Sequence, residues 1–281
     1  MTVTCEMSAL EERICSLFDN PAPERSEDNL DLLLQFRDAL NRGEARVIDL
    51  SGDSWKVNIW VKKGILLHTV LGLLSDTTGD GHAIELDTLP RRRFAVSEAV
   101  RVGGESAVIR DGTYFGPEVT CMQPLFVNMG VYIGAASVLD SNCMVGLCAQ
   151  IGERVHVGPA AQIGGFISPL ESMPTIIGDD VTIGGGCCVY GGVSVGQGAI
   201  LMPGTVVGPE SRLYDLARKT IWKGTTEQPL AVPPQAIVLP GAVPLTQGVA
   251  AGSGLFVQMP VITSYRDDPA FTGDPLAGLM L

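Results

Sequence analysis

Basic residues, histidine and charge in general are scarce in this sequence. Only 18% of the 281 residues are charged, and 31 acidic side chains against 19 basic ones give a formal net charge of -12. Nucleic acids and anionic membrane surfaces select basic patches, so we expect neither as a partner. A run of about 18 uninterrupted apolar residues is absent as well, so we expect no membrane-spanning helix.

Paired cysteines are also lacking. The seven cysteines are an odd number, and Cys143, Cys187 and Cys188 lie in the repetitive part of the chain, where a thiol serves as a small core or surface group. The amino terminus, MTVTCEMSALEERICSLFDN, has acidic residues where a secretory signal would have a basic start and an apolar run. We therefore expect a protein of the reducing cytoplasm.

What the chain does contain is a six-residue repeat between Val127 and Arg212. An aliphatic residue recurs at every sixth position, and a small or β-branched residue usually stands four places later, as Ile133 and Ser137 do. No helix has that period, whereas one short strand plus one corner fits it. Three such units close a coil of about 18 residues, and coils stack roughly 4.8 Å apart. The repeat therefore predicts a parallel β-helix of undetermined hand, whose frequent second-position glycine gives the corner its backbone freedom.

Three parts are expected along the chain. Residues 1–98 are predicted to form an amino-terminal helical or mixed domain, because apolar residues recur at helical spacing over the first 45 residues and indicate two or three helices. The segment WVKKGILLHTVLGLL fits either a helix or a buried strand. Residues 99–245 are predicted to form the β-helix, and residues 246–281 a strand and tail.

Interruptions of the repeat are candidates for ligand-binding loops. The segment PLESMPTI lies between Ile163 and Ile177, and a longer one, LYDLARKTIWKGTTEQPLA, follows Arg212. Insertions in a solenoid become loops on one face, which is often the face that binds ligands. After them, VPPQAI and VLPGAV restore the phase and predict two further units. The basic cluster 91–93 fits either a solvated patch or a phosphate contact.

Several segments resemble the tetrahydrodipicolinate N-succinyltransferase family. They are LDSNCMVGLCAQIGERVHVG, FVNMGVYIG and IGGFISPLESMPTIIGDD in the repeat, QFRDALNRGEARVIDLSGDSWKVNIWVKKGILL near the amino terminus, and LFVQMPVI near the end. This resemblance implies a left-handed β-helix and a homotrimer with active sites between subunits. It also implies acyl transfer from a coenzyme A thioester to the amine of an amino dicarboxylic acid.

The resemblance assigns two substrate-binding residues. Arg101 matches the family arginine that holds the substrate, and a guanidinium binds a carboxylate through two parallel hydrogen bonds. Asp140 matches the aspartate at the reacting amine, and it stands where the repeat prefers glycine, so a structural preference is given up for a carboxylate. We expect Asp140 to be catalytic, orienting the amine and accepting its proton.

Pocket positions depart from the family pattern. The family has an arginine and a glutamate where this chain has Gly186 and Cys188, a glutamate at Ser168, and a large aromatic residue at Asn142. Ser168 and Cys188 are therefore predicted to bind a different substrate. Because a succinyl group needs a cationic partner, the missing arginine favours transfer of a smaller acyl group, acetyl, as in a tabtoxin-type secondary pathway.

Glycines at three corners are predicted to form the wall against coenzyme A. Gly186, Gly204 and Gly241 would let a ligand approach the backbone, although each fits a purely structural corner equally well.

Three alternatives compete with this assignment. The first is the housekeeping succinyltransferase of lysine biosynthesis, and the second is an inactive binding or scaffold relative. The third, a zinc enzyme of the same fold, would need three histidines at one metal, whereas His68 and His82 precede the repeat and only His156 lies in it, so no metal is expected.

His156 fits a cleft residue or a surface residue. Cys188 fits a pocket wall better than a nucleophile, because no histidine is placed by sequence to activate it.

Overall fold

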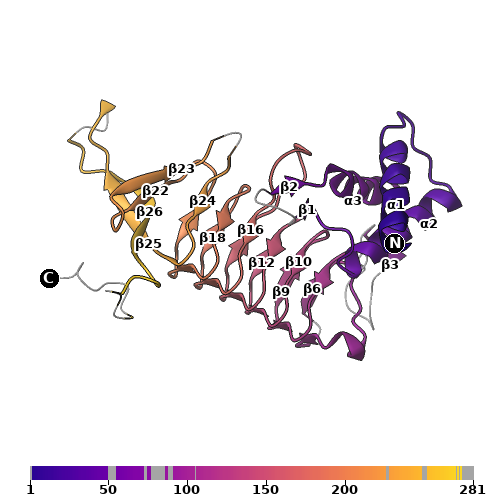
Figure 1. Cartoon of the computed structure of the whole chain (residues 1–281), viewed down its shortest axis with the longest axis horizontal. Helices are drawn as coiled ribbons and strands as arrows, with labels where there is room; N and C mark the ends of the chain where they lie inside the picture. The colour runs from indigo at the N-terminus through magenta and orange to yellow at the C-terminus, as the bar shows by residue number, and fades with distance from the viewer. Residues whose placement is uncertain are drawn as a thin grey trace.

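The computed structural model describes residues 2–49, 55–72, 75–76, 86–87, 91–104, 106–225, 228–248, 252–269, 271 and 273. Figure 1 shows three parts in line: helices at the amino-terminal end, a prism of stacked coils in the middle, and a long hairpin at the carboxyl-terminal end. His82 lies outside the described residues.

The amino-terminal part contains helices α1 (Thr2–Phe18), α2 (Glu27–Asn41) and α3 (Ile59–Leu71). Ser26 caps α2, because its hydroxyl accepts a hydrogen bond from the Asn29 amide at 3.2 Å. The helices share one apolar core, in which Ile14, Phe36 and Ile65 are fully buried. The segment that fitted either a helix or a buried strand is thus helix α3. In the described part of the chain, no helix has the length and apolar character needed to cross a bilayer.

Short strands follow α2 and α3, and one short helix precedes the prism. They are β1 (Ile48–Asp49), β2 (Lys56–Val57), β3 (Ser75–Asp76), β4 (Leu86–Asp87) and the 3-10 helix η1 (Val96–Glu98).

The prism is a left-handed parallel β-helix with three faces, each a sheet of two- or three-residue strands. Face 1 consists of β7 (Tyr114–Phe115), β10 (Tyr132–Ile133), β13 (Gln150–Ile151), β16 (Ile176–Ile177), β19 (Ser194–Val195) and β24 (Ala231–Val232). Face 2 begins with β5 (Arg101–Val102), β8 (Thr120–Cys121), β11 (Val138–Leu139), β14 (His156–Val157), β17 (Thr182–Ile183) and β20 (Ile200–Leu201). Face 3 consists of β6 (Ala107–Ile109), β9 (Leu125–Val127), β12 (Met144–Val145), β15 (Gln162–Ile163), β18 (Cys188–Val189) and β21 (Val206–Val207).

The interior of the prism follows the six-residue period. Ile133, Leu139 and Val145, which begin three successive units, are all fully buried, as are Ser137 and Cys143 four places later. Strands one coil apart pair in parallel, so that Val138 pairs with His156 and Leu139 with Val157. The predicted parallel β-helix is confirmed, because burial repeats with the six-residue unit and strands one coil apart pair in parallel.

The corner glycines have a different role from the predicted one. Gly134 and Gly152, at the second position of their units, do not have a positive φ, whereas the fourth position does, at Ala136 (57°), Asn142 (62°) and Ala160 (57°). A Cβ on Gly134 would lie 2.5 Å from the carbonyl carbon of Gly152 in the next coil. At Gly134, glycine is therefore required for close stacking of coils rather than for backbone freedom.

The chain leaves the prism at its carboxyl-terminal end. The first restored unit forms β24, but the prediction of a second, VLPGAV, is wrong beyond Val238. There the chain does not turn at a corner. Instead β25 (Ala236–Pro244) continues as one strand and forms antiparallel hydrogen bonds with β26 (Phe256–Tyr265). The interruption after Arg212 forms the hairpin β22 (Arg212–Asp215) and β23 (Thr220–Lys223), and β26 also pairs with β22. The predicted limits at residues 99 and 245 stay a prediction.

A buried lysine joins α3 to the insertion that follows β15. Lys62 is fully buried, and its ammonium donates hydrogen bonds to the carbonyl oxygen of Ser172 at 2.6 Å and to the Ser172 hydroxyl at 3.3 Å. Burial lowers the pKa of Lys62 from its usual value. The helical domain thus holds the PLESMPTI loop, which interrupts the six-residue repeat between β15 and β16.

This lysine makes a testable contribution to the pH dependence of stability. Between its lowered pKa in the folded protein and about 10.4 in the unfolded chain, the unfolded state binds more protons, so stability must rise with pH in that window. We expect the free energy of unfolding of wild type to increase, relative to that of Lys62→Met, as pH rises through this window. Urea unfolding at several pH values measures the difference. Lys63→Met is the control, because a hydrogen bond to Asp19 raises the pKa of Lys63. A difference for Lys62→Met that does not change with pH would contradict this assignment.

Candidate active site

Two of the predicted substrate residues, Arg101 and Asp140, lie on face 2 and on its edge with face 3. Outward-facing side chains on face 2 form one column across the strands. In order along the prism they are Arg101, Thr120, Val138, His156, Thr182 and Ile200. Arg101 begins this column and is exposed, and among the described residues its guanidinium has no partner. A free guanidinium at the start of the column is available to an anionic ligand.

Asp140 lies at the corner directly after β11. Its backbone is fixed by a hydrogen bond from the Asp140 amide to the Val157 carbonyl at 2.8 Å. One carboxylate oxygen, Oδ1, accepts a hydrogen bond from the Ser141 amide at 2.7 Å, while Oδ2 lies 3.7 Å from Nε2 of His156. The side chains of Asp140 and His156 are 33% and 49% exposed, so both can meet a ligand.

His156 is the residue that sequence reasoning failed to place. A signal for its position was present, because His156 follows Val138 by one full 18-residue coil and therefore lies beside it on the next strand. The sequence left it open whether His156 lies in a cleft or on the surface. The structure places it next to the predicted catalytic carboxylate.

The edge between faces 2 and 3 brings Asp140 together with two of the three predicted coenzyme A glycines. Gly186 and Gly204 occupy the same corner position as Asn142, two and three coils further along the prism, with φ of 66° and 78°. The amide of Gly186 donates to Pro159, and that of Gly204 donates to Gly185, at 2.8 and 3.0 Å. A Cβ built on either glycine meets no atom within 4 Å, so the space outside both is open.

Gly241 lies apart from this edge. It is in β25 opposite Met259 of β26, and a Cβ added there would lie 2.4 Å from Cγ2 of Val261. We predicted that a ligand approaches the backbone of Gly241, but in the structure strand β26 occupies that space.

Ser168 and Cys188 lie on or beside face 3 rather than face 2. Cys188 is in β18, where it pairs with Gln162 of β15, and Ser168 is exposed in the insertion after β15. The hydroxyl of Tyr190 donates to Oε1 of Gln162, and the neighbouring Cys188 together with partial burial raises the pKa of Tyr190 to about 12. Within one chain, these residues are therefore on a different wall of the prism from Asp140.

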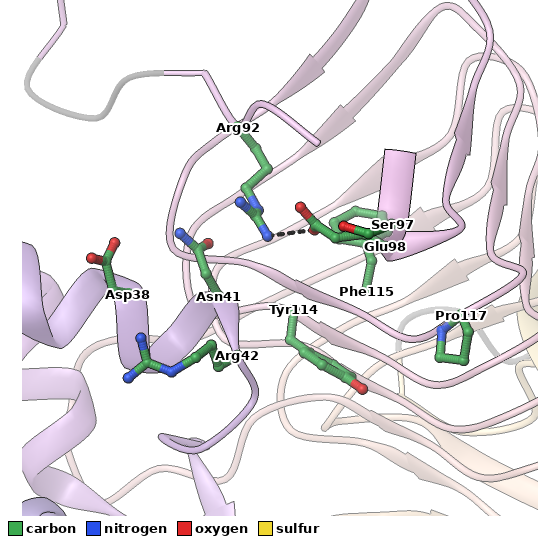
Figure 2. A pocket seen from close by; sticks show the side chains of 9 residues that line it. All are labelled: Asp38, Asn41, Arg42, Arg92, Ser97, Glu98, Tyr114, Phe115 and Pro117. Carbon is green, nitrogen blue, oxygen red and sulfur yellow. Dashed lines mark hydrogen bonds and ion pairs between the residues drawn. The ribbon is translucent and has the colours of Figure 1, made fainter. Parts of the chain in front are cut away.

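Within the basic cluster 91–93, the side chain of Arg92 is held by contacts inside the protein. Arg92 donates to Oε2 of Glu98 at 2.7 Å, as Figure 2 shows, and its guanidinium also lies 5.1 Å from the ring centre of Phe94. The pair borders a cavity of about 600 Å³ between α2 and the first coils. Arg42 at the same cavity is paired with Glu44 at 2.7 Å. Arg92 is therefore neither a solvated side chain nor free for a phosphate, and Asp140 does not line this cavity.

Nothing in the geometry favours a metal site. Among the described residues, no three side chains of histidine, cysteine, aspartate or glutamate are grouped so that they could hold a metal ion. His68 is buried within α3, far in sequence from the column that contains His156.

Comparison with known proteins finds two family models that match parts of the chain, and curated relatives that match most of it. The family described as "Tetrahydrodipicolinate N-succinyltransferase N-terminal" matches residues 9–71, and "Bacterial transferase hexapeptide (six repeats)" matches residues 174–209. The 2,3,4,5-tetrahydropyridine-2,6-dicarboxylate N-succinyltransferase of Nitrobacter winogradskyi is 36% identical over 84% of this chain and 85% of its own. That of Bradyrhizobium diazoefficiens is 35% identical over 85% and 86% of the two chains. The chain therefore belongs to the tetrahydrodipicolinate N-succinyltransferase family and is an acyl-CoA-dependent N-acyltransferase.

Proposed function

We propose that this enzyme transfers an acetyl group from coenzyme A to the amine of an amino acid related to the lysine pathway. The observation that carries the proposal is the order of Arg101, Asp140, Gly186 and Gly204 from coil to coil along face 2 and its edge with face 3. A carboxylate, an amine and a thioester can lie over one surface in that order. We place the reaction in the cytoplasm, in a secondary pathway of the tabtoxin type.

The acceptor binds at the Arg101 end of this surface. Two coil steps of about 4.8 Å separate Arg101 from Val138, whose unit leads into Asp140. An acceptor held by its carboxylate at Arg101 must therefore carry its amine several bonds away to reach Asp140. Bidentate binding by the guanidinium fixes the direction of the acceptor as well as its position.

The acyl donor binds at the Gly186 end. Along the edge between faces 2 and 3, from Asp140 to Gly204, Asp140 is the one side chain that is charged at neutral pH. Gly186 leaves open space where the family has an arginine. The carboxylate of a succinyl group would approach Asp140 with no cation on this edge to offset the repulsion. An acetyl group carries no such charge, and this supports acetyl as the group transferred.

A second subunit is needed to close the cleft. Face 2 is an open wall, and Ser168 and Cys188 can face it only from a neighbouring copy. The outward side chains of face 3, at Phe126, Met144 and Cys188, are uncharged and partly buried, as suits a surface that meets another subunit. We propose a homotrimer in which face 3 of one subunit covers face 2 of the next.

The donor preference can be tested by restoring the missing cation. Wild type is expected to turn over acetyl-CoA in preference to succinyl-CoA with the same amine acceptor. Gly186→Arg is expected to shift the ratio of kcat/KM values towards succinyl-CoA by about 10-fold, the factor that corresponds to one charge-assisted hydrogen bond of ~1.4 kcal/mol. Ala160 adopts the same corner conformation, so a side chain is tolerated there.

Gly204→Arg is the control for this substitution, because it adds the same charge one coil further along the edge. An equal shift in both variants would indicate a general charge effect and would remove Gly186 from donor selection.

The housekeeping succinyltransferase of lysine biosynthesis is the second candidate function. The names of the curated relatives favour it. Wild-type turnover only with succinyl-CoA and the cyclic dicarboxylate acceptor would establish it in place of acetyl transfer. Absence of turnover with either thioester would favour an inactive binding or scaffold protein.

A further inference from the structure

We infer that His156 is the proton acceptor in acyl transfer and that Asp140 positions it. This inference rests on the proposed function, since it concerns the same surface. It departs from the sequence-based expectation, in which Asp140 itself takes the proton.

The two side chains are held together by adjacent strands. Nε2 of His156 lies 3.7 Å from Oδ2 of Asp140, within ion-pair distance. The Asp140 amide is bonded to the Val157 carbonyl at 2.8 Å, and the His156 amide to the Val181 carbonyl at 3.0 Å. Because both backbones belong to the same ladder of stacked coils, the distance between the two groups is set by the fold rather than by loop conformation.

Asp140 is the only charged side chain directly beside the imidazole among the described residues. Strand neighbours in the column are Val138 and Thr182, which do not titrate. Two residues before His156, Arg154 is occupied by Asp180 and Glu153 at 2.7 Å each, at the edge with face 1. Arg101 lies three strands away on face 2. Among these groups, Asp140 is the one carboxylate placed beside the imidazole.

The chemistry favours the imidazole as the base. The neutral amine nitrogen attacks the thioester carbonyl carbon and forms the C–N bond, its proton passes to the imidazole, and the C–S bond breaks as the carbonyl re-forms. The imidazolium then returns the proton to the coenzyme A thiolate, so that amide and free thiol are the products. A histidine gains and loses a proton between about pH 5 and 8, whereas a carboxylate is a much weaker base at neutral pH.

The carboxylate has a matching second role. Its Oδ1 is engaged by the Ser141 amide, which fixes the group, and Oδ2 remains for the imidazole. A negative charge at this point stabilises the imidazolium that forms during the reaction. Asp140 is then a catalytic residue through its contact with the amine and positions His156 at the same time.

The test is a kinetic comparison of wild type with His156→Gln over pH 5.5 to 9, using acetyl-CoA and the amine that wild type accepts. We expect kcat to fall about 100-fold, with KM for both substrates changed less than about threefold, and the acid limb of the kcat/KM profile due to the imidazole to disappear. Ser194→Ala, which changes an outward side chain on face 1, should leave kcat and the pH profile as in wild type. Addition of free imidazole to His156→Gly should restore part of the lost rate.

Two results would overturn the inference. In the first, wild type is active and His156→Gln has the same kcat and the same acid limb as wild type. His156 would then have no part in proton transfer, and the proposed function would stand. No transfer by wild type from either thioester to any candidate amine would refute the proposed function, and the role of His156 with it.

Discussion

Asp140→Asn is expected to lower kcat about 1,000-fold, because it removes both the proposed contact with the amine and the charge that supports proton transfer to His156. Asparagine has the same shape, and its Oδ1 can still accept the hydrogen bond that the Ser141 amide makes at 2.7 Å. What it loses is the negative charge that lies 3.7 Å from Nε2 of His156 and that we propose faces the acceptor amine. Steady-state kinetics with acetyl-CoA would measure the effect, and the thermal unfolding midpoint should stay close to that of wild type.

Asp180→Asn is a matched control for this substitution. Asp180 is also a corner aspartate, but it lies at the edge between faces 1 and 2, where it accepts hydrogen bonds from Arg154 at 2.7 and 3.1 Å. The arginine lowers the pKa of Asp180, so this ion pair stabilises the fold above the usual aspartate pKa and loses that effect as pH falls. Turnover by Asp180→Asn should match wild type at neutral pH. Equal turnover by Asp140→Asn and wild type would exclude Asp140 from the mechanism.

The repeat made the prism predictable, but it could not reveal which side chains share a wall. A period of six specifies which residues are inside, as at Ile133 and Leu139, because burial depends only on position within the unit. Neighbours across coils depend on the number of residues per coil, which is constant only where no insertion intervenes. Asp140 and His156 lie in such an uninterrupted stretch, so their contact could have been derived from the 18-residue spacing.

Other features required the structure. Gly241 keeps the phase of the repeat, yet its strand continues into a hairpin because β26, which is distant in sequence, offers a partner. Ser168 and Cys188 were grouped with Asp140 through family resemblance, whereas the fold puts them on another face. In the homotrimer that we propose, their placement in one cleft would depend on contacts between subunits, which no pattern within a single chain encodes.

The second-position glycines provide a stability prediction. Gly134 is buried between coils, and a Cβ there would lie 2.5 Å from the carbonyl carbon of Gly152 and 2.6 Å from the amide nitrogen of Glu153. Both atoms are backbone, so relief requires two coils to separate against their own hydrogen bonds, including that from the Gly134 amide to Ile151 at 2.9 Å. We expect Gly134→Ala to lower the free energy of unfolding by about 3 kcal/mol, the upper end of ordinary overpacking costs.

Gly204→Ala separates this steric effect from backbone strain. Gly204 has φ of 78°, which disfavours alanine, but a Cβ added there would have no atom within 4 Å. Because Ala136 and Ala160 already adopt the left-handed corner conformation, the cost should be about 1 kcal/mol. Urea unfolding of both variants under the same conditions measures the two costs. If Gly134→Ala were no less stable than Gly204→Ala, coil contact could not be the reason that glycine recurs at the second position, and backbone freedom would again be the better explanation.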